Sequence, residues 1–178
     1  MRLLLSVLIA ALPTLLSAAE PDKGAEGAFK QLQSLIGSWE GKFEDGRSHS
    51  VSYRLTAGGT VLVETWTLAP GRESLTLYSI DGDNLIATHY CPQGNQPRLQ
   101  LVGGGDPGRL SFEFRDGTNL QVKGKSHQHA FWIKVLGENS FERSETYVDN
   151  GSTSSEIAAT PQGKAITYTR IGSREQAR

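Results

Sequence analysis

Turn-forming pairs recur along the chain at intervals of about 8 to 12 residues, and this spacing constrains the fold more than any other feature. Examples are Asp45-Gly46, Gly58-Gly59, Pro70-Gly71, Asp116-Gly117 and Asn150-Gly151. About ten such turns leave room for ten short strands joined as hairpins. A closed up-and-down barrel leaves no strand edge exposed, whereas a sandwich, the alternative, would need long crossover connections that the sequence lacks. We therefore predict an all-β, antiparallel up-and-down β-barrel of about ten strands.

The segments between the turns alternate apolar and polar residues, a pattern typical of strands with one buried and one solvent-exposed face. This pattern is clear in residues 39–44, 51–55 and 110–115. Before the first of them, Phe29, Leu32 and Ile36 recur at helical spacing, which predicts a short N-terminal helix. The stretch from Thr118 to Ser126 lacks a strand pattern and is expected to form a loop or lid.

The first 19 residues have the pattern of a secretory signal peptide. Arg2 supplies the positive charge, an apolar run extends from Leu3 to Leu16, and Ser17-Ala18-Ala19 offers small residues for cleavage. We therefore expect a signal peptide at 1–19, a flexible lead at 20–28 and one barrel domain at 29–178. The protein would be exported, periplasmic or secreted, with no membrane insertion after cleavage.

Charge and cysteine content narrow the classes of partner. The net charge is −1, and no run of Lys or Arg is interleaved with aromatic residues, so nucleic acid is not an expected partner. Cys91 is the only cysteine, and it cannot form an internal disulfide. The same charge balance gives no reason to expect binding to an anionic membrane surface.

The segment Leu35-Ile36-Gly37-Ser38-Trp39-Glu40-Gly41 resembles the Gly-x-Trp opening of calycins, which include lipocalins, fatty-acid-binding proteins and nitrobindins. In such barrels the Trp plugs one end and a basic residue of the last strand covers it. The resemblance implies these roles for Trp39 and Arg170, and it keeps Trp39 among the candidate ligand contacts as the floor of a pocket. A buried aromatic plug with no ligand contact is the alternative.

Strings in the middle of the chain resemble an uncharacterised family of exported bacterial lipocalin-like domains. They are Leu77-Tyr78-Ser79-Ile80-Asp81-Gly82-Asp83, Thr88-His89-Tyr90-Cys91, Gly94-Asn95-Gln96-Pro97, Gly117-Thr118-Asn119 and the His127-x-His129 pair. The segment from Asn150 onward matches less well. The resemblance implies a fold and no activity.

Two histidine-bearing segments are the strongest candidates for a site. Strict alternation would place His127 and His129 on the same face as Phe131, and His89 and Cys91 have the same spacing on another strand. If both pairs face the lumen, His89, Cys91, His127 and His129 could hold zinc or another divalent metal. Hydrogen-bonded core histidines are the alternative, because nothing in the sequence shows that the pairs converge.

Carboxylates and one amide complete the candidate set. Glu64 lies between Leu62 and Trp66 on one face of its strand, and Glu145 shares a side with Arg143, which could serve as an ion-pair partner. Either face could point outward, since alternation does not say which side is inside. Asn119, in one of the family strings, is included as a candidate ligand contact.

Three functional hypotheses follow. The first is a barrel that binds a small ligand in its lumen, with His89, His127 and His129 as polar contacts. The second is a metal- or haem-binding barrel, or a metal-assisted enzyme with Glu64 as proton carrier. Phe43 replaces the second glycine of the nitrobindin opening, which ranks haem below zinc. The third is a structural or protein-binding module. Neither the cofactor nor enzymatic activity is settled by the residues.

Overall fold

The computed structural model describes residues 24–44, 46–103 and 106–172. The elements in chain order are α1 (Ala25–Gln33), β1 (Gly37–Lys42), β2 (Ser48–Thr56), the short 3-10 turn η1 (Ala57–Gly59), β3 (Val61–Ala69), β4 (Arg72–Asp81), β5 (Asn84–Tyr90), β6 (Gln96–Val102), β7 (Arg109–Thr118), β8 (Ser126–Gly137), β9 (Ser140–Asp149), α2 (Ser154–Ala159) and β10 (Ile166–Ile171). The predicted signal peptide lies outside the described residues. No helix among the described residues is long and apolar enough to cross a membrane.

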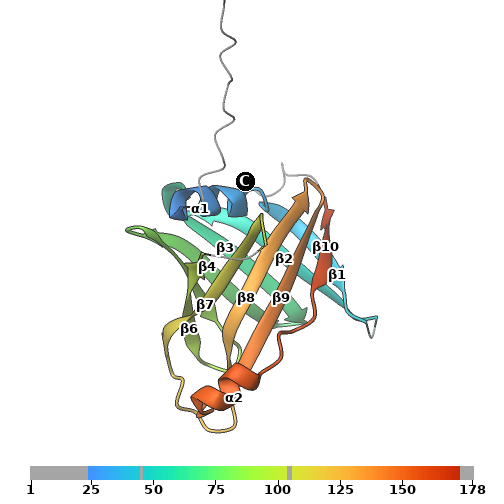
Figure 1. Cartoon of the computed structure of the whole chain (residues 1–178). Coiled ribbons are helices and arrows are strands. Elements are labelled where there is room, and N and C mark those ends of the chain that lie inside the picture. The colour runs from blue at the N-terminus through green and yellow to red at the C-terminus, as the bar shows by residue number, and fades with distance from the viewer. Residues whose placement is uncertain (1–23, 45, 104–105, 173–178) are drawn as a thin grey trace, which may run out of the picture.

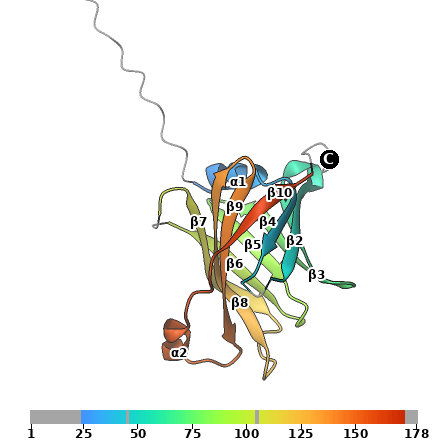
Figure 2. The ribbon, with the colours of Figure 1, turned by 90° about the vertical axis from the view of Figure 1, so that its right-hand side faces the viewer.

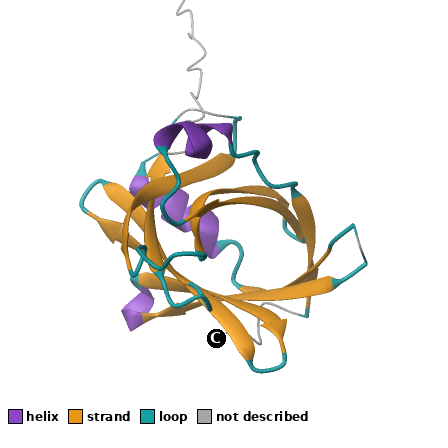
Figure 3. Cartoon of the chain, turned by 90° about the horizontal axis from the view of Figure 1, so that it is seen from below, coloured by secondary structure: helices purple, strands orange, loops and turns teal. Residues whose placement is uncertain are grey.

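The ten strands form one closed barrel in which each strand pairs antiparallel with its sequence neighbours, and β10 closes the ring on β1 (Figures 1 and 3). The fold class predicted from the turns is therefore confirmed. Helix α1 begins at Ala25, inside the stretch expected to be a flexible lead, because Ala25 and Ala28 add to the buried face formed by Phe29 and Leu32. The predicted loop between β7 and β8 is present.

One end of the barrel is closed by α1 and by a stack of side chains beneath it. Trp39 is fully buried, and its indole Nε1 donates to the Leu35 carbonyl at 2.7 Å. Arg170 pairs with Trp39 across β1 and β10, and its guanidinium carbon lies 4.0 Å from the indole centroid. The same guanidinium donates to the carbonyls of Ile36 and Ser34. The predicted plug of Trp39 beneath Arg170 is thus confirmed as geometry.

Helix α2 was not predicted. It lies between β9 and β10 and projects from the barrel wall near the end opposite α1 (Figures 1 and 2). Thr153 and Glu156 form a capping box at its start, in which each side chain bonds the other residue's backbone. That Thr-x-x-Glu spacing was the one sequence signal for the helix.

Candidate functional site

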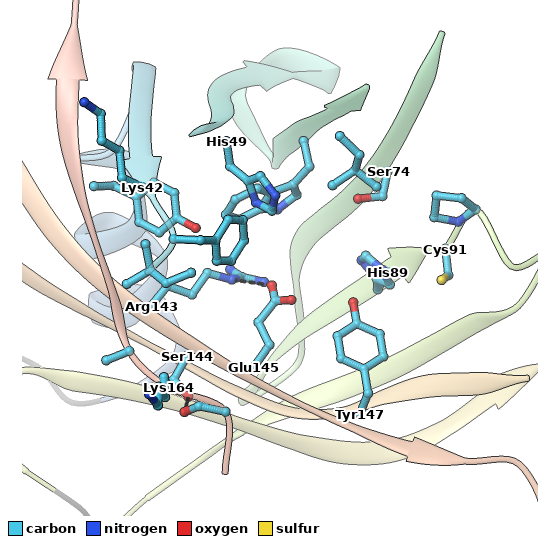
Figure 4. Close-up of a pocket in the computed structure, with 18 of the residues that line it drawn as sticks. Lys42, His49, Ser74, His89, Cys91, Arg143, Ser144, Glu145, Tyr147 and Lys164 are labelled. Atoms are coloured by element: carbon cyan, nitrogen blue, oxygen red, sulfur yellow. Dashed lines mark hydrogen bonds and ion pairs between the residues drawn. The ribbon is translucent and has the colours of Figure 1, made fainter. Parts of the chain in front are cut away.

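A cavity of about 670 Å³ occupies the half of the barrel remote from α1. The β1–β2, β3–β4 and β5–β6 turns all lie at that end, because an up-and-down barrel places alternate turns together. Figure 4 shows polar side chains from several strands pointing into this space. The charged and polar lining comprises Lys42, Glu44, His49, Arg72, Ser74, His89, Cys91, Gln93, Arg143, Ser144, Glu145, Tyr147 and Lys164, and the aromatic lining also includes Phe43, Trp66 and Tyr168.

A buried charge network forms the floor of this cavity. The Glu64 carboxylate is fully buried and accepts from Trp66 Nε1 at 2.5 Å, Tyr78 Oη at 2.6 Å and Arg143 Nη1 at 2.8 Å. Burial raises the pKa of Tyr78, and the neighbouring Glu64 charge raises it further, so Tyr78 keeps its proton and remains a donor. A buried ion pair of this kind persists only where hydrogen bonds satisfy the charged atoms.

Arg143 connects that network to the open cavity. Its Nε donates to Glu145 Oε1 at 2.8 Å, while its Nη1 binds Glu64 and Tyr78. The guanidinium carbon lies 4.3 Å from the Phe131 ring centroid, which fixes the plane of the group. The remaining nitrogen, Nη2, is buried and has no hydrogen-bond partner among the described residues. A rigid, incompletely satisfied donor group therefore lies at the cavity floor.

His89 lines the cavity as a buried imidazole. Its Nδ1 lies 3.1 Å from the Thr76 hydroxyl on the neighbouring strand β4. Burial lowers the pKa of His89, so the ring is neutral near pH 7. Cys91 also lines the cavity, two residues further along the chain, and is half-buried.

The lining of the cavity as a whole carries more cationic than anionic side chains. Four cationic side chains line the cavity, Lys42, Arg72, Arg143 and Lys164, against the two carboxylates of Glu44 and Glu145. Lys164 pairs with Glu44 at 2.7 Å, and Arg143 pairs with Glu145. Within the described part of the chain, Arg72 and Lys42 have neither an ion pair nor a side-chain hydrogen bond.

The expected face of the β8 histidines was wrong because a β-bulge interrupts the strand. Gln128 pairs with Tyr147, and Ala130 pairs with Thr146, the adjacent residue of β9. His129 therefore has no partner in β9 and is an extra residue in β8. The bulge reverses the alternation, because a shift of one residue moves every preceding side chain to the other face. Gln128, not His127, therefore shares the cavity side with Tyr147.

His127 and His129 contact each other but are not part of the lining of the described cavity. His89 and Cys91 are part of it, so the structure does not bring the two predicted pairs into one ligand set. Across residues 24–44, 46–103 and 106–172, no three His, Cys, Asp or Glu side chains are grouped to hold a metal ion. The predicted four-ligand arrangement is not formed.

The other predicted contacts occupy different parts of the barrel. Trp39 belongs to the closed end, and Asn119 is exposed, with its amide donating to the Gly94 carbonyl at 3.1 Å. Glu64 is inside, yet its partners are Trp66, Tyr78 and Arg143 and include no histidine. Its role in this geometry is to hold Arg143 and the two aromatic donors.

Several cavity residues escaped sequence reasoning. Arg72 and Ser74 continue the inward alternation of β4 that includes Thr76, and this period was a usable signal. Tyr147 follows Arg143 and Glu145 at the same period. What the sequence could not show is that these faces, more than 70 residues apart in the chain, point into one space.

The closed ten-stranded antiparallel ring, the N-terminal helix and the Trp plug define a calycin-like β-barrel. No protein-family model and no curated protein sequence matches this chain. Among solved structures it is similar to Rv2717c from M. tuberculosis, with 17% identity, a TM-score of 0.50, and coverage of 82% of this chain and 98% of that one. It is also similar to a protein of unknown function of the DUF3598 family from Nostoc punctiforme, with 14% identity and a TM-score of 0.48. That match covers 79% of this chain, which spans about half the length of the Nostoc protein.

Proposed function

We propose that this protein binds a small organic ligand in the open half of its barrel. The observation that carries the proposal is the cavity of about 670 Å³ with a preformed polar floor. Ligand pockets in proteins have volumes of roughly 300 to 1,000 Å³ and combine an apolar lining with a few fixed polar groups. Here the apolar lining comes from Phe43, Trp66 and Tyr168. The fixed polar groups are those of Ser74, His89 and Arg143.

The floor is suited to a hydrogen-bond acceptor. Arg143 is held by Glu64, Tyr78 and Glu145, so binding does not have to order it. Because the Glu145 carboxylate lies beside the guanidinium, a neutral carbonyl or hydroxyl oxygen suits the floor better than a second anion. The Arg143 Nη2 atom, which has no partner in the described chain, has almost no accessible surface, so a ligand oxygen reaches it only if the floor opens slightly on binding.

The mouth favours a negative charge on the ligand. Arg72 lies at the start of β4 on the same face as Ser74, and Lys42 ends β1 on the same rim. Since neither cation is neutralised by a described side chain, an anionic group at the mouth gains Coulomb energy without breaking an existing pair. We infer a ligand with an anionic end at the mouth and a neutral acceptor toward the floor.

Export is part of the proposal. The signal pattern at 1–19 lies outside the described residues, and the ligand would be one met in the periplasm or outside the cell.

Two matched dyes test the proposal. Anilinonaphthalene sulfonate is an anion, and N-phenylnaphthylamine has the same ring system without the sulfonate. Both should bind the folded protein, with the anionic dye tighter, in fluorescence titrations. Arg72→Gln should weaken binding of the anionic dye about fivefold, equivalent to about 1 kcal/mol for an ion pair at a partly solvated mouth, and leave the neutral dye unchanged.

A cavity-filling variant separates the site from unspecific binding. Ser74 is 6% exposed and lines the cavity, so Ser74→Trp should abolish binding of both dyes. Cooperative urea unfolding of each variant verifies that the fold persists. Equal dye affinity in wild type and Ser74→Trp would refute the site, whereas loss of both dyes in Ser74→Trp with no effect of Arg72→Gln would refute only the charge preference.

A further inference from the structure

The bulge in β8 brings two imidazole nitrogens together outside the cavity. Side chains two residues apart in a regular strand are separated by about 7 Å. Here His127 Nε2 and His129 Nδ1 are 3.4 Å apart, because the extra residue bends the strand at this point. Phe114 packs against both rings, stacked on His129 at a centroid distance of 5.2 Å, and restricts their rotation.

The protonation of His127 follows from its neighbour Asn150. The Asn150 amide nitrogen donates to the Val122 carbonyl at 3.1 Å, which identifies the other amide atom, Oδ1, as the oxygen. That oxygen lies 2.8 Å from His127 Nδ1. An amide oxygen only accepts, so His127 Nδ1 must carry the hydrogen. In the neutral ring, Nε2 is therefore left with a lone pair directed toward His129.

An outer partner that fixes the tautomer in this way is the usual support of a metal-binding histidine. Zinc binds imidazole nitrogen at about 2.0 to 2.1 Å with tetrahedral angles, which places two coordinating nitrogens about 3.3 Å apart. The observed 3.4 Å between His127 Nε2 and His129 Nδ1 is close to this nitrogen–nitrogen distance, and it is long for a hydrogen bond between two ring nitrogens.

We propose that His127 Nε2 and His129 Nδ1 chelate one divalent transition-metal ion, with Asn150 as the residue that positions His127. His129 would bind through Nδ1 with its proton on Nε2. His129 is half-buried, so solvent can reach the pair. No third His, Cys, Asp or Glu of the described chain joins them, which leaves the other coordination positions to solvent or a further ligand. Affinity should follow the order of these metals for nitrogen ligands, with Cu²⁺ above Zn²⁺.

The test is calorimetric titration of the full chain, purified without a histidine tag, with Zn²⁺ or Cu²⁺ alone. One equivalent should bind, and Cu²⁺ should bind more tightly than Zn²⁺. His127→Gln and His129→Gln should each weaken binding at least tenfold. The matched control His49→Gln removes one histidine elsewhere and should leave the affinity unchanged. Asn150→Ala should weaken binding about tenfold, the effect typical of removing an outer partner.

A nitrogen-detected imidazole spectrum supplies a readout that does not depend on affinity. The metal-free protein should show His127 as the Nδ1–H tautomer, and Zn²⁺ should shift the His127 and His129 signals while the His89 signals stay in place. Unfolding midpoints of the variants in EDTA verify that they are folded. Absence of binding to the wild type, or equal affinity in His127→Gln, His129→Gln and His49→Gln, would overturn the proposal. Because His127, His129 and Asn150 lie outside the cavity lining, substituting them should leave dye binding unaffected, and each proposal can fail without the other.

Discussion

Replacing Arg143 with Met tests whether the buried network holds the floor of the cavity. At the observed 2.8 Å from Glu64, the pair interaction is roughly 6 kcal/mol at an effective dielectric constant of about 20, before desolvation is counted. Measured costs of breaking one partner of a buried pair are about 3 to 5 kcal/mol, because the other charge stays buried without compensation. We expect Arg143→Met to lower the free energy of unfolding by that amount. The milder Arg143→Lys keeps the charge and should cost less.

Urea unfolding followed by circular dichroism measures this effect, and a double-mutant cycle with Glu64→Gln isolates the pair. Glu64→Gln leaves the Arg143 charge without its main partner, so it is also destabilising. The double variant has no unpaired buried charge, and its loss should be smaller than the sum of the single losses by about 1 to 3 kcal/mol. Additivity within about 0.5 kcal/mol would show that the pair is not coupled and would refute the reasoning.

Three further predictions concern other parts of the barrel. Gly163→Ala would force a methyl group against the Glu145 backbone carbonyl, so it should lower both the unfolding midpoint and dye affinity, while Gly137→Ala, with open space around it, should change neither. The folded-state pKa of His89 is lowered by burial, so the unfolded chain binds the extra proton first; stability should fall as pH drops below about 6.5, and His89→Gln should flatten that part of the stability profile. Arg170→Gln removes charged hydrogen bonds at the closed end and should cost about 2 to 3 kcal/mol of stability in urea unfolding without altering dye affinity.

The fold was predictable because its determinants are local. Turn residues indicate the number of strands, and the alternation of apolar and polar residues within each segment indicates a strand with one solvent-exposed face. The Trp39 and Arg170 plug depends on the first and last strands, and it was anticipated from the resemblance to calycins and not from spacing. Helix α2 was predictable in principle from Thr153 and Glu156, but its six residues are too few to show a period.

The site was less predictable because its determinants are not local. The bulge at His129 depends on how β8 pairs with β9, and the residue pattern of β8 alone does not predict it. Glu64 and Arg143 are 79 positions apart, so the sequence could show that each needs a partner but not that they are partners. The sequence left the face of His89 open, and the structure buries this side chain in the cavity lining.

The location of the bound ligand tests the central claim most directly, and the three tryptophans provide one probe each. Trp66 lines the cavity, Trp39 lies at the closed end, and Trp132 lies beneath Arg109, outside the cavity lining. Proton–nitrogen correlation spectra of the indole N–H groups should be recorded with and without saturating anilinonaphthalene sulfonate. A ligand in the open half of the barrel should shift the Trp66 signal and leave those of Trp39 and Trp132 in place. A shift confined to Trp132 or Trp39, or bound dye with all three signals unmoved, would contradict a ligand site in this cavity.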